Sequence, residues 1–330
     1  MLVNNGKTKF MVINGDENDK KPIEIRGNKV GYVEEFYLYL GGIFTDCGNM
    51  SKVMEIHARE KMKHLNKLSI FLHTNKDYPF YVKRKMVTAA FNSAIMYGAE
   101  SWIGANIKPV ETIYLSAIKQ LLGVRNTTPN LTCLIECNMP PLHSILAQKQ
   151  YNFLKSAIEE RSDMIDEDPF IFVWSLLKRF DEPLASKVDS ILEHSDHIER
   201  GVMEIKRRVT TSEGTKSKIY KTINPELITH PVYHSRQLTP EAYRISFTRL
   251  RLTSHNLRSE TGRWSRLPVD RRLCPCGGIQ DEEHIITSCP KTHALRTALS
   301  NPPVFPDFLS NNDDVSFKYI HEALNFDYNS

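Results

Sequence analysis

Short apolar runs at the start of the chain predict β-strands. The run KFMVI (9–13) is a strand candidate, and IEIRGNKV (23–30) alternates apolar and polar residues around Gly27-Asn28, a hairpin signal. A further strand is predicted for FYLYLGGIF (36–44), where Gly41-Gly42 would permit a bend or bulge. Because these strands are short and few, they predict the edge of a sheet rather than a whole sheet.

From Ser51 onward, apolar residues recur at helical spacing with Lys and Arg between them. One helix is predicted to run from there to Asn75–Pro79, and a second from Pro79 to Gly98. Further helices are predicted over 110–123, 142–161 and 170–180. The predicted fold class is therefore mainly α with a small β portion.

Residues 205–239 are rich in Lys, Thr, Ser and Pro, a composition typical of an exposed connector. We therefore expect a domain boundary there. The predicted organisation is strands over 1–48, a helical block over 49–204, an exposed linker over 205–239, a basic helix with a small cysteine-rich module over 240–298, and a tail over 299–330.

The helix predicted to begin at Thr239-Pro240 has two distinct faces. On a helical wheel, an arginine edge lies beside an apolar stripe, although the sequence Ser-His-Asn at 254–256 could end the helix before its last members. The stripe contains Tyr243, Phe247, Leu250 and Leu257, and the edge contains Arg244, Arg251, His255 and Arg258.

Composition adds a local charge imbalance to this picture. The 330 residues carry a net charge of only +4, but residues 241–273 hold eight arginines against three acids, a local +5. From 274 to the end, eight acids face three bases, a local −5. The N-terminus lacks the apolar core of a signal peptide and no apolar run reaches about 20 residues, so we expect a cytoplasmic or nuclear protein without a membrane partner.

The stretch CPCGGIQDEEHIITSC (274–289) predicts a metal site. Reduced thiols that cluster in this way indicate metal rather than disulfides, and Cys274, Cys276, His284 and Cys289 have the spacing C-x-C-x7-H-x4-C. These ligand types favour structural zinc, and Gly277-Gly278 would let the backbone wrap around the ion. Two alternatives stay open, because the Cys-x-Cys spacing is tighter than usual: His293 could replace one ligand, or the thiols could lie beside a core histidine without a metal.

Other candidates for chemistry are weaker. Cys133 and Cys137 are four residues apart, which favours a small apolar patch on a buried helix. Asp313-Asp314 lies in a polar stretch without a third acid at a motif-like distance, which favours a solvated loop. The sequence contains no P-loop, no dinucleotide-binding glycine fingerprint and no nucleophile-elbow serine.

Several stretches, in this order, resemble the C-terminal half of a non-LTR (LINE-type) retrotransposon reverse transcriptase. VNNGKTKFMV (3–12) resembles polymerase motif D, FYLYLGGIFTDCG (36–48) the primer grip, and the helices through IMYGAESW (95–102) the thumb. RLRLTSHNLRSETGRW (249–264), followed by RLCPCGGIQDEEHIITSCP (272–290), resembles the family's arginine-rich helix and its CCHC zinc knuckle. The resemblance covers most of the chain.

The resemblance implies a role for each matching segment. Residues 1–48 would be a residual palm edge, with Lys7 as the motif D lysine and Tyr39, Leu40 and Gly41 as the primer grip. Residues 49–204 would form the thumb and a connector that contact a template–primer duplex. The zinc knuckle would hold its ion through the four ligands above, and the preceding arginines would contact template RNA or target DNA: Arg244, Arg249, Arg251, Arg258, Arg263, Arg266, Arg271 and Arg272.

The chain also departs from the family pattern. In the family, an RNA-directed DNA polymerase, the carboxylates that hold two magnesium ions lie upstream of motif D. We therefore expect no bound magnesium and no enzymatic activity from this sequence as given, which would be a truncated copy or a fragment that could assemble with an intact reverse transcriptase. Two rival hypotheses are a non-enzymatic zinc-containing module that binds nucleic acid or protein, and a helical interaction protein without metal.

Overall fold

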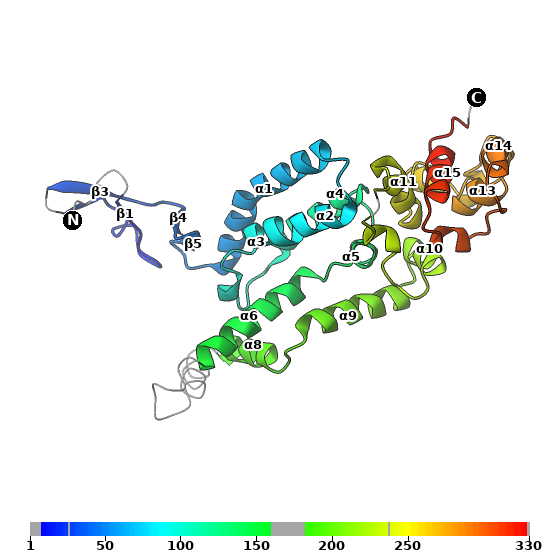
Figure 1. The fold of residues 1–330 in the computed structure, drawn as a ribbon. Coiled ribbons are helices and arrows are strands. Elements are labelled where there is room, and N and C mark those ends of the chain that lie inside the picture. Colours follow the sequence, from blue (N-terminus) through cyan, green and yellow to red (C-terminus); the bar gives the residue numbers. More distant parts are fainter. Residues whose placement is uncertain (1–7, 26, 160–181, 237, 329–330) are drawn as a thin grey trace. The chain divides into compact units, whose positions relative to one another are not determined.

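The computed structural model describes residues 8–25, 27–159, 182–236 and 238–328. Helices dominate the described chain and the strands are short (Figure 1), so the predicted mainly α class with a small β portion is confirmed. Within these ranges every helix is too short or too polar to cross a membrane. Lys7 and the helix predicted over 170–180 lie outside the described residues.

The first sheet contains the predicted hairpin. Strands β2 (Ile23–Ile25) and β3 (Asn28–Tyr32) pair antiparallel, with Ile23 opposite Val30, and β1 (Lys9–Phe10) adds to β3 in parallel. Gly27 has a φ of +76°, a backbone conformation that glycine adopts without steric cost. The hairpin signal at Gly27-Asn28 is therefore confirmed, whereas the strand predicted over 9–13 is limited to two residues.

The strand predicted over 36–44 is instead a second hairpin, and the prediction of one continuous strand is wrong. Strands β4 (Phe36–Tyr39) and β5 (Gly42–Thr45) pair antiparallel around Leu40 and Gly41. Both turn residues have positive φ, 48° and 86°, as a two-residue type I′ turn requires. Any Cβ on Gly41 would also lie 2.5 Å from the ring of Tyr97, so this turn position is restricted to glycine.

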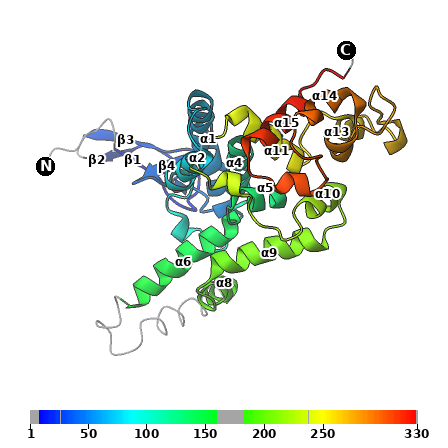
Figure 2. The ribbon, with the colours of Figure 1, turned by 45° about the vertical axis from the view of Figure 1, so that its right-hand side comes forward.

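One compact unit comprises Met1–His64, Asn92–Tyr114 and Leu142–His197. Its core includes Met54, Ile95 and Trp102, all at most 5% exposed. Besides the strands and the first part of α1 (Met50–Thr74), its described helices are α3 (Asn92–Ile95), the 3-10 turn η2 (Ala99–Ser101), α6 (Leu142–Glu159) and α8 (Glu182–Leu192). Helix α6 packs against η2 and α8, and α6 and α8 lie side by side in both views (Figure 1 and Figure 2).

The helices predicted over 51–74 and 110–123 are confirmed as α1 (Met50–Thr74) and α4 (Lys108–Leu122). The segment predicted as one helix from Pro79 to Gly98 is helical but divided. It forms α2 (Phe80–Met86), a π-helical turn η1 (Val87–Phe91) and α3, and ends at Gly98 with a φ of +76°. Helix α6 confirms the helix predicted from 142 as far as the chain is described.

The second compact unit comprises Leu65–Phe91, Leu115–Pro141 and Ile198–Ser330. In it, helix α15 (Asp314–Leu324) packs against α11 (Glu241–Arg251), α13 (Glu282–Thr287) and α14 (His293–Thr297), as Figure 1 shows. Phe247 of α11 meets Phe317 of α15 edge to face, with 4.9 Å between the ring centroids. Its further helices include α5 (Asn130–Cys137), α9 (His197–Thr211), α10 (Thr215–Ile223) and α12 (Arg258–Trp264). Among the described residues of this unit there are also four 3-10 turns: η3 (Pro231–Tyr233), η4 (Val269–Arg271), η5 (Pro290–Thr292) and η6 (Asp307–Ser310).

The prediction of an exposed linker over 205–239 is wrong, because most of this segment is folded into the second unit. It supplies the end of α9, all of α10 and the turn η3. Tyr220 and Tyr233 are 1% and 0% exposed. Although the segment is rich in Lys, Thr and Ser, it also contains apolar residues at helical spacing, such as Ile205 and Val209. These two side chains are buried in the core, whereas the polar residues between them remain solvated.

Candidate metal centre

A short hairpin positions the first two cysteines of the predicted zinc site. Leu273 pairs with Ile279 in an antiparallel bridge, and the turn between them is closed by two backbone hydrogen bonds. The amide of Cys274 donates to the carbonyl of Gly278 at 2.7 Å, and the amide of Gly277 donates to the carbonyl of Cys274 at 2.8 Å. The Cys-x-Cys spacing is therefore accommodated by a tight turn that brings both sulfurs to one side.

Each glycine of this turn is required for a different reason. Gly277 has a φ of +97°, in the left-handed region that residues with a side chain rarely adopt. Gly278 has ordinary φ, but a Cβ there would lie 2.8 Å from Cε1 of His284. The second glycine thus leaves room for the imidazole of the third ligand.

Helix α13 positions the remaining two ligands. Asp281 caps this helix by accepting a hydrogen bond from the amide of His284 at 2.9 Å. Cys289 follows the end of the helix, and its own amide donates to the carbonyl of His284 at 2.8 Å. The His-x4-Cys segment thus brings both ligands to the same side of the cluster.

The four ligand atoms form a cluster of the size that zinc requires. All lie within 4.8 Å of one another. The sulfur of Cys289 is 3.7 Å from that of Cys274 and 3.9 Å from that of Cys276, which is 3.2 Å from Nε2 of His284. Tetrahedral zinc, with bonds of about 2.3 Å to sulfur and 2.0–2.1 Å to nitrogen, places its ligands roughly 3.5–3.8 Å apart.

The same geometry decides between the ligand alternatives. His284 belongs to the cluster, whereas His293 is exposed at the start of α14 and lies outside it. Nδ1 of His284 is 3.3 Å from Oγ of Ser288, the kind of second contact that orients a ligating imidazole. Such a Cys3His group could hold a metal ion, and its donor set fits structural zinc.

The ionisation of the ligands depends on their environment. Burial raises the pKa of the Cys274 thiol to about 12, so this sulfur needs a neighbouring cation to become a thiolate. Burial also acts to raise the pKa of Cys276, but hydrogen bonds from the Gly278 amide and from the cysteine cluster outweigh it and lower that pKa. Burial lowers the pKa of His284, which favours the neutral, metal-ligating imidazole.

Contacts from Tyr319 and His255 help to attach the hairpin and α13 to the rest of the second unit. Tyr319 of α15 donates its hydroxyl to the carbonyl of Ile286 at 2.6 Å. His255 and Glu282 form a buried pair, with 2.8 Å between Nε2 and Oε1. Because Nδ1 of His255 accepts from the amide of Leu257, Nε2 is the nitrogen that carries the proton and donates to Glu282.

The prediction of an arginine edge on one long helix is wrong for Arg244 and Arg251, which are buried. Helix α11 ends at Arg251, so the break expected at 254–256 does occur, and both arginines are buried, at 4% and 3% exposure. Arg244 donates to the carbonyls of Leu121 and Leu122 at 3.4 and 3.3 Å. Arg251 pairs with Glu136 of α5, so neither guanidinium is available to a polyanion.

The other six predicted arginines divide between structural and exposed positions. Arg272 donates to the carbonyls of Ser259 and Leu267 at 2.7–3.0 Å and so joins α12 to the loop that follows it. The exposed Arg249 donates to the carbonyl of Gly123 at 2.7 Å, and Arg263 lies 3.5 Å from Glu260. The remaining three, Arg258, Arg266 and Arg271, are exposed, and their side chains form no ion pair with any residue that the structure describes.

Glu136 is an important residue that the sequence interpretation missed. Its carboxylate is 0% exposed and accepts from Nε of Arg251 at 2.5 Å and from the hydroxyls of Tyr220 and Tyr233 at 2.8 and 3.0 Å. Burial alone would lower the pKa of Arg251, but the Glu136 carboxylate outweighs this effect and raises it. A lone acid inside an apolar helical run was the only available signal.

The weaker candidates have structural roles. Burial raises the pKa values of Cys133 and Cys137 to about 12, so both are neutral thiols within the core, as the sequence favoured. Asp313 accepts from the amide of Ser316 at 2.8 Å and caps α15, so the Asp313-Asp314 pair starts a helix and is not part of a simple loop.

The residues that would form the primer grip lie at the turn between β4 and β5. Tyr39 and Leu40 are 58% and 77% exposed, and the carbonyl of Leu40 accepts a hydrogen bond from the hydroxyl of Tyr97 at 2.8 Å. This placement leaves their role a prediction.

No protein-family model matches the chain, and neither the curated proteins nor the solved structures contain a match to it.

Proposed function

We propose that this chain binds nucleic acid through a zinc-stabilised module at residues 258–289. The cluster of Cys274, Cys276, His284 and Cys289 is the observation that carries the proposal, because it indicates a metal-stapled hairpin directly after the most arginine-rich part of the chain. Arginines bind phosphate through charge-assisted hydrogen bonds, which give affinity without reading sequence.

The exposed arginines near the hairpin support the proposal. Arg258 begins α12, Arg266 follows this helix, and Arg271 precedes the first metal ligand, Cys274, by three residues. Between them lies Trp264, whose indole is 55% exposed and carries the guanidinium of Arg125 at 4.3 Å from the ring centroid. Cationic groups interleaved with an aromatic surface are typical of sites that bind single strands.

The resemblance to LINE-type reverse transcriptases extends the proposal to the whole chain. Residues 1–48 would then be a palm edge, the helical block a thumb, and the partners template RNA, target DNA or an intact reverse transcriptase. We assign no polymerase activity to the 330 residues. A reading frame that continues upstream of the Met1 codon into a palm with paired aspartates would make the chain part of an enzyme, and a stop codon there would mark a truncated copy.

Two measurements test the function. Zinc should be present at close to one equivalent per purified chain, and a value below half an equivalent would favour the rival helical protein without metal. Nucleic-acid binding measured from 50 to 200 mM salt should weaken steeply, because phosphate contacts release counterions.

Substitution of the exposed arginines locates the binding surface. The triple variant Arg258→Gln, Arg266→Gln and Arg271→Gln should make the slope of log affinity against log salt for a single strand shallower by about 2, at roughly 0.7 per lost phosphate contact. A control with the same loss of charge is Arg207→Gln, Arg208→Gln and Lys218→Gln on α9 and α10. Equal slopes for the two variants would show that net charge, and not this surface, governs binding.

A further inference from the structure

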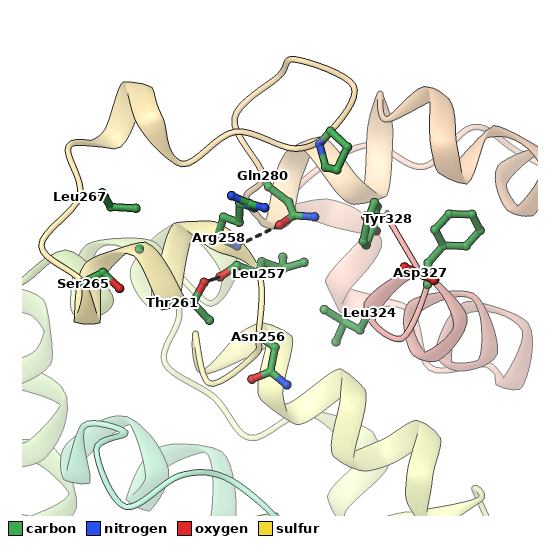
Figure 3. Close-up of a pocket in the computed structure, with 13 residues that line it drawn as sticks. Asn256, Leu257, Arg258, Thr261, Ser265, Leu267, Gln280, Leu324, Asp327 and Tyr328 are labelled. Atoms are coloured by element: carbon green, nitrogen blue, oxygen red, sulfur yellow. Dashed lines mark hydrogen bonds between the residues drawn. The ribbon is translucent and has the colours of Figure 1, made fainter. Parts of the chain in front are cut away.

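A cavity of about 490 Å³ lies beside the metal hairpin, within the second unit (Figure 3). Helix α12 and the residues before it form one wall, including Leu257 and Arg258. The hairpin contributes Pro275 and Gln280, and the segment after α15 contributes Phe326. The volume falls in the range of about 300–1,000 Å³ that small ligands occupy.

The lining combines flat apolar surface with polar groups. Leu257, Pro275 and Phe326 provide apolar surface, and the ring of Phe326 packs edge to face on Tyr328 at 5.3 Å. Asn256 and Asp327 add an amide and a carboxylate at other points of the lining. The cavity thus offers a stacking surface together with separate hydrogen-bonding groups.

Several of these polar groups are held in place by the fold. Oε1 of Gln280 accepts from the backbone amide of Arg258 at 3.1 Å (dashed in Figure 3), which fixes the side chain while its Nε2 has only a weak contact to the Cys274 sulfur at 4.0 Å. Oδ1 of Asn256 accepts from Arg125, so its Nδ2 is the donor that remains. The guanidinium of Arg258 forms no ion pair with a residue that the structure describes.

This chemistry excludes two simple classes of ligand. A purely apolar molecule would leave Nδ2 of Asn256 without a partner and Nε2 of Gln280 with only its weak sulfur contact, which costs free energy. A free cation would be repelled by Arg258. A nucleobase has two apolar faces and an edge with both donors and acceptors, and a neighbouring phosphate could reach the arginine.

We propose that this cavity holds one unpaired nucleobase of a bound single strand, stacked on Phe326 and contacted at its edge by Gln280, with Arg258 at the adjacent phosphate. The inference rests on the proposed function and names its substrate as single-stranded nucleic acid. A base in a duplex would have to leave its stack to enter.

Abasic strands provide the test. The full chain is titrated by fluorescence anisotropy, at one salt concentration, with a 12-nucleotide single strand and with the same strand carrying abasic sites throughout. The wild type should bind the natural strand about tenfold or more tightly than the abasic one, since base stacking on aromatic side chains contributes about 1–3 kcal/mol per base.

Two cavity variants connect this ratio to the cavity. Ser265→Trp fills it from an exposed position, and Phe326→Ala removes the stacking ring. Each should reduce the natural-to-abasic ratio to about 2 or less without weakening the abasic strand. The matched control Ser300→Trp places the same side chain at an exposed serine outside the cavity and should keep the wild-type ratio.

The possible outcomes separate the two proposals. If Ser265→Trp keeps the wild-type ratio, or if the wild type binds both strands equally, the cavity inference is overturned and the proposed function stands. If the wild type binds neither strand, the proposed function fails as well. The double variant Arg266→Gln and Arg271→Gln should weaken both strands equally, which would identify phosphate contacts that are independent of the base.

Discussion

Replacement of the buried carboxylate of Glu136 should destabilise the protein strongly. Glu136→Gln keeps the shape of the side chain but removes the charge that faces Arg251, whose side chain is 3% exposed. The amide oxygen of the glutamine could still accept one hydrogen bond from Arg251, and the bond from Nη1 of Arg251 to the carbonyl of Leu309 at 2.8 Å would be unaffected. The variant therefore leaves a buried, uncompensated positive charge, which typically costs about 3–5 kcal/mol in free energy of unfolding.

The chain offers a matched control for this substitution. Arg59 also contacts both carboxylate oxygens of Glu35, at 3.2 and 3.3 Å, but the two side chains are 57% and 54% exposed. Glu35→Gln should cost about 1 kcal/mol or less, because water solvates and screens the exposed pair. The two variants differ mainly in burial.

Urea unfolding followed by circular dichroism measures both effects. With a slope of roughly 3 kcal/mol per molar urea, Glu136→Gln should lower the midpoint by about 1 M or more. The double variant Glu136→Gln, Arg251→Met should recover much of the loss, since it removes both members of the pair. A loss of under 1 kcal/mol for Glu136→Gln, equal to that of the control, would refute the inference that this charge pair is desolvated.

Three further predictions concern the metal site and the core. Chelation or Cys276→Ser should lower the unfolding temperature and remove bound zinc, whereas Cys47→Ser, at an exposed cysteine outside the cluster, should leave both unchanged. Gly278→Ala should weaken zinc binding by about tenfold or more in a chelator competition, because its Cβ would lie 2.8 Å from the histidine ligand, while Gly214→Ala meets nothing closer than 3.6 Å and should bind normally. Burial lowers the pKa of His230 to about 4 from 6.5, so its contribution to stability is full above pH 6.5 and declines by about 3 kcal/mol as the pH falls toward 4; His230→Asn should flatten urea midpoints measured across this window.

The sequence predicted features that are determined by neighbouring residues. The metal ligands lie within sixteen positions, so their spacing alone limits the possible geometries, and the structure brings them together as expected. The hairpin at Gly27 and the helices α1 and α4 follow from turn chemistry and apolar periodicity in the same way.

Features that depend on distant partners were not predictable. The carboxylate that neutralises Arg251 is 115 residues away in the chain, and no local pattern distinguishes this arginine from the exposed Arg258 seven positions later. The prediction of an exposed linker over 205–239 was wrong for the same reason. Tyr220 and Tyr233 in this segment are buried against Glu136, which lies far away in the sequence. A local pattern of residue types predicts which face of a helix is apolar or charged, but not which distant residues pack against that face.

The net charge of the metal site limits how zinc could influence binding to nucleic acid. Three thiolates, a neutral imidazole and a divalent ion sum to a charge of about −1, so loading the site would not make the surface more positive. If zinc strengthens binding, the cause must be the arrangement of groups such as Arg258 and Arg271 around the folded hairpin. Zinc-loaded and chelated protein should then differ in affinity at every salt concentration, by a larger factor for the natural strand than for the abasic one. An equal factor for both strands would mean that the metal holds only the phosphate-binding arginines in place.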